Sequence, residues 1–301
     1  MVVMKLSFLE NTSGRTRHSC ASLCDNIYKD CYSQDQMKKE ESIPEMLERD
    51  LPELIDYVAR ENHVLEYRQN PDLVEKRLNA WHQFGLLTHT KMVRQVFLNE
   101  LEGILTSWGL YDQVKEVLDE EVSGIRKGKL LEASMPLHDL GKIVVLGDDR
   151  VDREHEAISR DLIYEDYFMK KLTRLGLGRA HIDYLAECIA SHDVVGKQIR
   201  DPFKHEGNLR LSYLSKKEAL KRCKEISSKY QNNTEIGVYF ICDLLGKTDI
   251  RLDAQDDESI LRQEQEIERI LREKELAPQL KKAVMQLPVN LKLAEIYLKS
   301  V

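Results

Sequence analysis

A histidine and an aspartate stand side by side at His138 and Asp139, within the stretch EASMPLHDLGK. Such a pair supplies one neutral imidazole and one carboxylate that can bridge two cations. The residues just before it are apolar or small, so the pair follows a buried face, where an unpaired carboxylate would be costly. The dipeptide alone is common, so its meaning depends on which other ligand-type side chains the fold brings to it.

Four more ligand-type side chains lie on the apolar faces of separate helical segments. Each is three, four or seven residues from large apolar residues of its own segment, which puts it on the inward stripe. They are His89, His155, His192 and Asp243. A lone inward histidine is more often a core residue, but four histidines and two aspartates in one helical core are hard to explain in that way. Imidazole and carboxylate ligands suit iron, manganese, nickel or zinc.

The segments that must position these residues are helical nearly throughout. Apolar residues recur at helical spacing from about residue 42 onward, and we find no strand alternation of useful length and no internal repeat. Ser42, followed three residues later by Glu45, fits a capping box at the start of the first clear helix. The sequence therefore predicts an all-α protein.

Three segments follow from the patterning. Residues 1–41 are weakly patterned and are expected to be an irregular N-terminal segment or an added helix. Residues 42–255 are expected to form the metal-binding helical domain. Residues 256–301 are charge-rich and are expected to form a C-terminal helical extension, broken by Pro278 and Pro288.

The composition excludes several classes of protein. A hydrophobic share of 42% and a charged share of 32% are typical of a globular chain, and a net charge of −7 gives no bulk attraction to nucleic acid or anionic lipid. Neither a signal peptide nor a bilayer-spanning stretch is apparent, so we expect a cytoplasmic protein with no membrane or nucleic-acid partner. Its six cysteines are expected to be reduced, and Cys20, Cys24 and Cys31 fit no common zinc spacing.

The stretch LHDLGK resembles the signature of the HD-domain superfamily of metal-dependent phosphohydrolases. Members of that family carry ligands in the order His, His-Asp, His, His, Asp. The same order is found here in THTKMVRQVF, LHDLGK, REHEAISRDL, IASHD and YFICDLLGKTD, over roughly residues 85–250. The resemblance implies an HD-domain helical bundle with N- and C-terminal helical extensions.

The resemblance also implies two divalent transition-metal ions. The ligands implied for the first ion are His89, His138, Asp139 and Asp243. Asp139 would bridge to a second ion held by His155 and His192. Water activated between the ions would attack phosphorus, with Asp139 positioning or deprotonating it, and Lys142 would reach the phosphate or remain a surface residue. The remaining histidines fit the set less well: His18, His63, His82, His181 and His205.

The least regular part of the chain, residues 194–229, is rich in basic residues. Lys197, Arg200, Lys204 and Arg210 are the candidates for binding the rest of a phosphorylated substrate, because Arg and Lys suit anionic oxygens. A solvated loop followed by a helix is the alternative interpretation of this stretch.

Three departures from the family pattern are visible. Pro136 should kink the helix ahead of the His-Asp pair, because it removes a backbone donor. The long interval between His89 and His138 predicts inserted helix near residues 111–124. No GYP motif follows His155, which argues against the HD-GYP branch. These departures do not change the expected fold, but they leave the identity of the substrate undetermined.

Three functions remain under consideration. The first is a phosphohydrolase or phosphodiesterase acting on a nucleotide or another small phosphate ester. The second is a mixed-valent di-iron oxygenase, since myo-inositol oxygenase and a phosphonate-degrading oxygenase are HD relatives with similar ligand sets. The third is a non-enzymatic, metal-stabilised interaction protein. The C-terminal extension would then offer either a homodimer seam or a helix packed on its own domain, through Ile260, Leu261, Ile267, Ile270 and Leu271.

Overall fold

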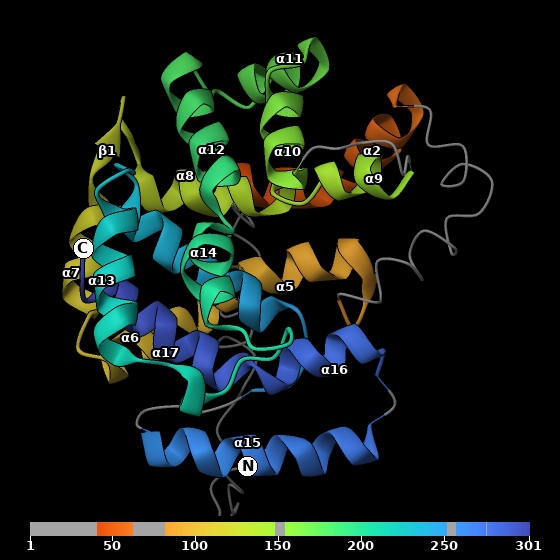
Figure 1. Cartoon of the computed structure of the whole chain (residues 1–301). Coiled ribbons are helices and arrows are strands. Elements are labelled where there is room, and N and C mark those ends of the chain that lie inside the picture. The colour runs from red at the N-terminus through yellow and green to blue at the C-terminus, as the bar shows by residue number, and fades with distance from the viewer. Residues whose placement is uncertain (1–40, 63–81, 148–153, 252–256, 275) are drawn as a thin grey trace, which may run out of the picture. The chain divides into compact units, whose positions relative to one another are not determined.

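The structure is a computed structural model that describes residues 41–62, 82–147, 154–251, 257–274 and 276–301. These residues are overwhelmingly helical (Figure 1), which confirms the predicted all-α class. The α-helices are α2 (Ile43–Glu61), α5 (Gly85–Asn99), α6 (Leu101–Ser107), α7 (Tyr111–Asp119), α8 (Lys127–Ser134), α9 (Gly141–Gly147), α10 (His155–Ile163), α11 (Asp166–Arg174), α12 (Arg179–Ser191), α13 (Lys216–Ser227), α14 (Asn233–Gly246), α15 (Asp257–Glu273), α16 (Pro278–Met285) and α17 (Leu287–Leu298). No helix in these ranges is long and apolar enough to cross a bilayer.

Short turns and one hairpin complete the described elements. The turns are the 3-10 helices η1 (Met135–Leu137), η3 (Asp201–Phe203) and η4 (Leu211–Tyr213), and η2 (Val195–Arg200) is a short π-helix. The predicted insertion is present as α7, and it continues into an antiparallel hairpin of β1 (Glu121–Val122) and β2 (Ile125–Arg126). The turn residues Ser123 and Gly124 have φ of 49° and 88°, the left-handed values that a two-residue hairpin turn requires. Strands this short show no alternation, so the sequence did not reveal them.

Some predictions fall outside the described residues. These include the irregular segment 1–41, apart from Glu41, and the cysteines at positions 20, 24 and 31. The cysteines that the structure does describe are unpaired and buried, in line with reduced thiols: Cys188, Cys223 and Cys242. Ser42 and Glu45 form the expected start of α2, since the Ser42 N–H donates to Glu45 Oε2 at 2.7 Å.

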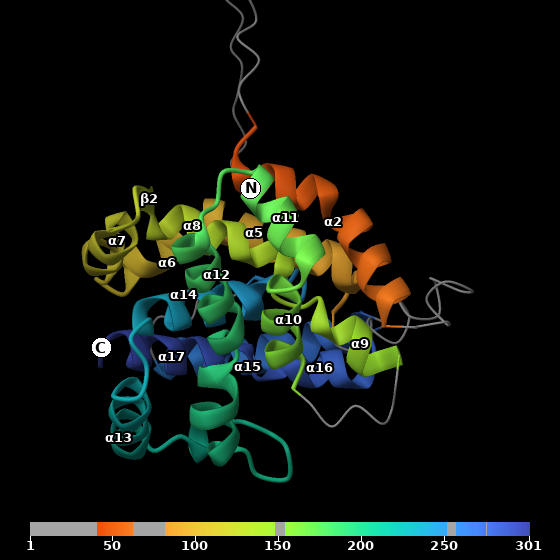
Figure 2. The same ribbon diagram turned by 90° about the horizontal axis from the view of Figure 1, so that it is seen from above.

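The central helix of the described part is α14. Every residue from 235 to 246 is buried, and Figures 1 and 2 show other helices on all sides of α14. A helix that is apolar around its whole circumference is stable only in such a position. Helices far from it in sequence, including α5 and α17, pack directly on α14.

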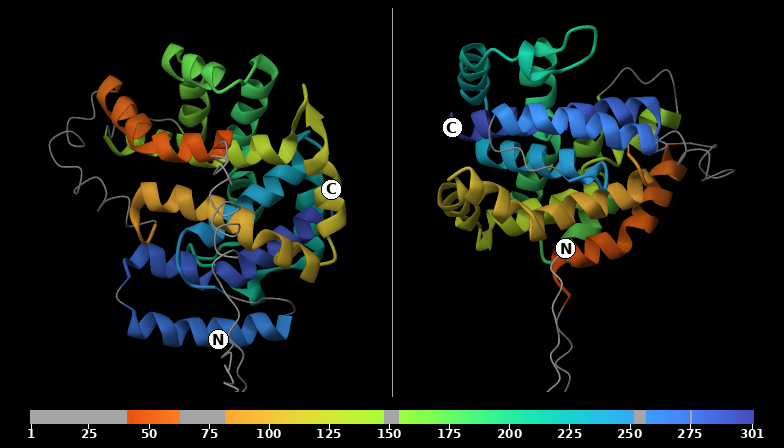
Figure 3. Two further views of the ribbon diagram at one scale, coloured as in Figure 1. Left: turned by 180° about the vertical axis from the view of Figure 1, so that it is seen from behind. Right: turned by 90° about the horizontal axis from the view of Figure 1, so that it is seen from below.

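The C-terminal helices share the core of the helices that precede them. Leu293 and Tyr297 of α17 are fully buried, and a Cβ added to Gly237 of α14 would lie 2.4 Å from Leu298 Cδ2, so α14 and α17 pack closely. Figure 3 shows α15, α16 and α17 together on one side of the molecule. Residues 42–301 accordingly form one compact unit. The division at residue 255 into a metal-binding domain and a C-terminal extension stays a prediction.

The apolar stripe of α15 faces the chain itself. Ile260 and Ile267 are fully buried and Leu271 nearly so, whereas the side chain of Leu261 is half exposed. Most of the stripe therefore packs on neighbouring helices of the same chain, and a homodimer through the C-terminal helices stays a prediction.

Candidate metal centre

The six ligand-type residues predicted from the sequence meet at one place in the structure. They are His89 on α5, His138 and Asp139 between η1 and α9, His155 at the start of α10, His192 at the end of α12, and Asp243 on α14. All are buried except His155, whose side chain keeps 19% of its surface exposed. Five separate elements thus supply one cluster.

The local sequence explains how the His-Asp pair is presented. Pro136 lies in the 3-10 turn η1, and α8 ends before it at Ser134, so the expected kink takes the form of an interruption of the α-helix. The new helix α9 begins at Gly141, where a Cβ would lie only 2.1 Å from the carbonyl oxygen of His155. The glycine therefore lets α9 touch the start of α10, which brings His155 to the His-Asp pair.

A first group of ligand atoms surrounds one oxygen of Asp139. Asp139 Oδ2 lies 3.3 Å from His89 Nε2 and 3.4 Å from His138 Nε2. Asp243 Oδ1 lies 3.1 Å from His89 Nε2 and 3.8 Å from His138 Nε2. These four residues form a buried group whose ligand atoms all lie within 4.8 Å of one another, so together they could hold one metal ion.

A second group surrounds the other oxygen of the same carboxylate. Asp139 Oδ1 lies 3.2 Å from His155 Nε2 and 3.8 Å from His192 Nε2, and these three residues again could hold an ion. Each oxygen of Asp139 therefore faces a different set of imidazoles. This is the arrangement that a carboxylate bridging two cations needs.

Backbone carbonyls fix the orientation of three imidazole rings. The Nδ1–H group donates in each case, which leaves Nε2 directed at the cluster with its lone pair free in the neutral ring. The distances from Nδ1 to the carbonyl oxygen are 3.1 Å to Gly246 for His89, 2.7 Å to Met135 for His138 and 2.7 Å to Ile189 for His192.

Several converging atoms in the cluster lack a hydrogen bond. Within the described residues, the buried Nε2 atoms of His89, His138 and His155 and the Oδ1 atom of Asp139 have no hydrogen-bond partner. Leaving buried polar atoms unsatisfied costs about 1–3 kcal/mol each. An ion in the first group would satisfy the atoms of His89 and His138, and an ion in the second those of His155 and Asp139, so the residues present fit one or two metal ions.

Two lysines hold the carboxylates in the ionised form. Lys142 Nζ lies 2.5 Å from Asp139 Oδ2, and Lys247 Nζ lies 2.5 Å from Asp243 Oδ2. Burial works against ionisation, but His138 and Lys142 hold the pKa of Asp139 well below its ordinary value, and Lys247, together with nearby imidazoles, does the same for Asp243. Both carboxylates are therefore charged and able to act as ligands.

The imidazoles respond to burial and to these carboxylates in different ways. Burial and the neighbouring rings of His138 and His155 lower the pKa of His192 well below its ordinary value, which keeps that ring neutral. Burial also acts to lower the pKa of His138, but Asp139 and Asp243 outweigh it and raise that pKa to about 9. An incoming metal ion must displace this proton, so metal binding releases protons and weakens in acid.

His82 also lies in the cluster, although the sequence did not favour it as a metal ligand. Its ring stacks on that of His89, with centroids 3.9 Å apart and an interplanar angle of 4°. His82 Nε2 lies 3.8 Å from Asp139 Oδ2 and 3.2 Å from Lys142 Nζ. The residue precedes α5, so helical spacing could not have placed it. Of the other histidines, His181 caps the start of α12 and His205 is exposed.

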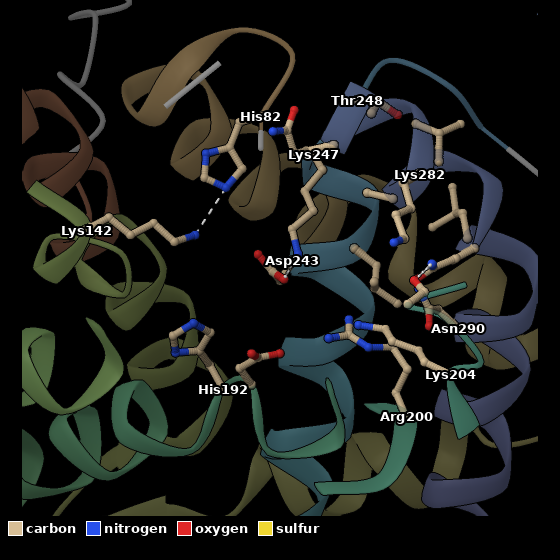
Figure 4. A pocket seen from close by; sticks show the side chains of 18 of the residues that line it. His82, Lys142, His192, Arg200, Lys204, Asp243, Lys247, Thr248, Lys282 and Asn290 are labelled. Carbon is tan, nitrogen blue, oxygen red and sulfur yellow. Dashed lines mark hydrogen bonds and ion pairs between the residues drawn. The ribbon is translucent and has the colours of Figure 1, made fainter. Parts of the chain in front are cut away.

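A cavity of about 520 Å³ opens beside the cluster (Figure 4). Metal-site residues line one part of it, and residues of η2, of the loop after η3 and of the C-terminal helices line much of the rest. The basic residues that line it are Lys142, Arg200, Lys204, Lys247 and Lys282, and the acidic ones are Asp193 and Asp243. The lining is therefore net positive in a chain whose net charge is −7, which favours an anionic ligand.

The four candidate substrate-binding residues separate into two pairs. Arg200 and Lys204 line the cavity. Lys197 does not, because its ammonium group pairs with the carboxylates of Glu154 and Glu156. Arg210 is exposed and is likewise not part of the lining. A role in substrate binding stays a prediction for all four.

No family model matches the sequence, and comparisons with curated proteins and with solved structures find no match. Membership of the HD superfamily accordingly stays a prediction that is supported by the order of the ligands and by their convergence in an all-helical fold.

Proposed function

We propose that this protein is an HD-type hydrolase of phosphate esters with a dinuclear metal centre. The observation that carries the proposal is the carboxylate of Asp139, whose two oxygens face two separate groups of histidines. Its neighbours His155, His192 and Asp243 line a cavity with a net positive lining. Both features suit phosphoryl transfer, because charge develops on oxygens during the reaction and must be stabilised there.

Two divalent ions held at this centre, whether iron, manganese, nickel or zinc, would supply Lewis acidity and a water nucleophile of lowered pKa. The chain's own residues would position the reactants. Asp139, as the shared ligand, would set where the attacking water lies. Lys142 reaches both Asp139 and the cavity, so its ammonium group would contact a phosphoryl oxygen of the substrate. Asp139 and Lys142 are therefore the proposed catalytic residues.

The proposed substrate is a nucleotide or another small phosphate ester. The cavity volume lies in the range of about 300–1,000 Å³ that is usual for small-molecule sites. Arg200 and Lys204 line the cavity and would bind the part of the substrate that does not react. Apolar lining residues, including Leu244 and Leu287, would contact its organic part.

The accessibility of the centre favours a catalytic role over a structural one. Structural metal sites are closed, whereas catalytic sites keep an open position. His155 is partly exposed, and both His155 and His192 line the cavity. A ligand in the cavity would thus reach the second group of metal ligands directly.

Metal analysis followed by assay tests the proposal. The protein would be purified without chelator, analysed by plasma mass spectrometry, and assayed against nucleoside phosphates, cyclic nucleotides and sugar phosphates. We expect two equivalents of metal and hydrolysis by the parent, and neither in Asp139→Ala. Asp166→Ala, which alters a highly exposed carboxylate on α11, serves as the matched control and should keep both.

Two outcomes would contradict the proposal. Full turnover by Asp139→Ala would remove that residue from the mechanism. A protein that holds iron, consumes O₂ with a polyol or phosphonate, and hydrolyses no ester would be an oxygenase of the same ligand set instead.

A further inference from the structure

The cavity wall that faces the metal centre is built by the C-terminal helices. Figure 4 shows Lys282 and Asn290 on the opposite side of the cavity from Lys142 and His192. Lys282 belongs to α16 and Asn290 to α17. This wall lies outside residues 85–250, to which the predicted ligands belong.

Lys282 differs from the other basic residues of the cavity. Each of those four pairs with a carboxylate: Lys142 with Asp139, Lys247 with Asp243, and Arg200 and Lys204 with Asp201. Among the described residues, no carboxylate pairs with Lys282. Its ammonium group lies over Gly207, only 2.5 Å from where a Cβ of that residue would be. The absence of a side chain at Gly207 leaves room for the lysine.

The neighbouring cations are only partly neutralised. Arg200 Nε and Lys204 Nζ approach the same oxygen of Asp201, at 2.8 Å and 2.7 Å. Asp193 adds one more carboxylate to the lining. Three cations against two carboxylates leave this side of the cavity positive, and charge-assisted hydrogen bonds from Arg and Lys are strong contacts for an anion.

Asn290 supplies an independent sign of a missing ligand at the same wall. Its side chain is buried, with 2% of its surface exposed, and it lines the cavity. Within the described residues its Oδ1 atom has no hydrogen-bond partner. A buried acceptor without a donor is unfavourable, so a hydroxyl or amine of the ligand, and not its anionic oxygens, would satisfy it.

We infer that the substrate carries a second anionic group, which binds Arg200, Lys204 and Lys282 while the reacting phosphate lies at the metal centre. The inference rests on the proposed function and narrows its substrate class. It selects molecules with two separated anionic groups, such as organic bisphosphates or nucleoside diphosphates and triphosphates, over simple monophosphates. The apolar residues Leu244 and Leu287 would contact the body that joins the two groups.

Binding of ligands that cannot be hydrolysed tests this independently of turnover. Metal-loaded full-length protein would be titrated by calorimetry with alkane bisphosphonates of increasing chain length and with alkylphosphonates of matching length. We expect one or more bisphosphonates to bind at least about tenfold more tightly than the matched monophosphonate, the gain typical of one charge-assisted contact. Lys282→Gln should remove most of that gain and leave the Kd of the monophosphonate unchanged.

Lys281→Gln is the matched control, because Lys281 is adjacent in sequence but does not line the cavity. It should leave both affinities unchanged. Equal affinity of monophosphonate and bisphosphonate at every length, or an unchanged preference in Lys282→Gln, would overturn the inference while leaving the proposed function standing. Failure of both ligands to bind metal-loaded protein would overturn the inference and the proposed function together.

Discussion

The carboxylate of Asp139 faces two groups of imidazoles, one at each oxygen. This arrangement depends on the burial of the side chain as much as on its position. The side chain is completely buried, so its charge is sustained only by the partners around it. Lys142 supplies one positive charge at Oδ2, and the histidines direct Nε2 atoms at both oxygens. Replacing Asp139 would therefore disturb both groups, whereas replacing an outer ligand should disturb only one.

Single-ligand variants should separate the two ions. We expect His192→Ala to retain about one equivalent of metal, because the first group is intact, and Asp243→Ala likewise to retain about one, because the second group is intact. Plasma mass spectrometry after dialysis measures this. His205→Ala changes an exposed histidine outside the cluster and should keep two equivalents. Two equivalents in both ligand variants would contradict the assignment.

The glycine after the His-Asp pair should be intolerant of any side chain. In Gly141→Ala, the added Cβ would lie 2.1 Å from the His155 carbonyl oxygen, and overpacking of this kind costs about 1–3 kcal/mol of unfolding free energy. The matched control is Gly103→Ala on α6, where no atom lies within 4 Å and alanine should stabilise the helix by about 0.5–1 kcal/mol. Urea unfolding compares them, and equal stability of Gly141→Ala and the parent would argue against this close approach.

At the scale of elements, close approach between helices decides where the ligands lie. A Cβ on Gly246 of α14 would lie 2.6 Å from Val93 Cγ2 on α5, so the two helices meet at a glycine. The carbonyl oxygen of the same glycine accepts the Nδ1–H of His89. This one contact therefore orients His89 and brings it to Asp243, three residues earlier on α14.

The last helix carries a pH-dependent contribution to stability. Burial acts to raise the pKa of Glu295. Lys292 and Lys299 outweigh burial through contacts of 2.7 Å and 2.6 Å, and lower that pKa below its ordinary value of 4.5. A lowered pKa means that the stabilisation is fully present above pH 4.5 and is lost as the pH falls through the lower folded value.

Glu295→Gln should therefore lower the free energy of unfolding by about 1 kcal/mol at neutral pH, a small value because Lys299 is half exposed. The difference from the parent should shrink near pH 3. Urea titrations at both pH values measure it, with Glu268→Gln, an exposed position on α15, as the control. A difference that is constant with pH would rule out the ion pairs as its cause.

For the molecule as a whole, the metal centre joins five elements that are distant in sequence. Metal binding should consequently stabilise the folded state as a unit, by about 2.7 kcal/mol for each bound ion when free metal is at a hundredfold excess over its Kd. We expect a chelator to lower the thermal midpoint of the metal-loaded parent and to have no effect on Asp139→Ala. An unchanged midpoint in the parent would show that the cluster does not hold a metal ion under those conditions.

The sequence by itself determined the helical class and the six candidate ligands, but not the place of His82 in the cluster. Both depend on periodicity, because a buried helical face must repeat every three to four residues, and a histidine or aspartate on that face must point inward. His89 and Asp243 were recognisable for this reason, and a distortion of the helix at Pro136 was expected from its missing backbone donor.

Only the tertiary structure decided which of these residues contact one another and which of them line the cavity. The packing of separate helices decides which oxygen of Asp139 faces which imidazoles. It also brings His82 next to Asp139. Lys197 looked equivalent to Arg200 in sequence, but nearby carboxylates hold it away from the cavity. Lys282 joins the cavity from a helix about 140 residues beyond the His-Asp pair. Periodicity specifies which way a side chain faces within its own element, whereas contacts between elements are set by the packing of the whole chain.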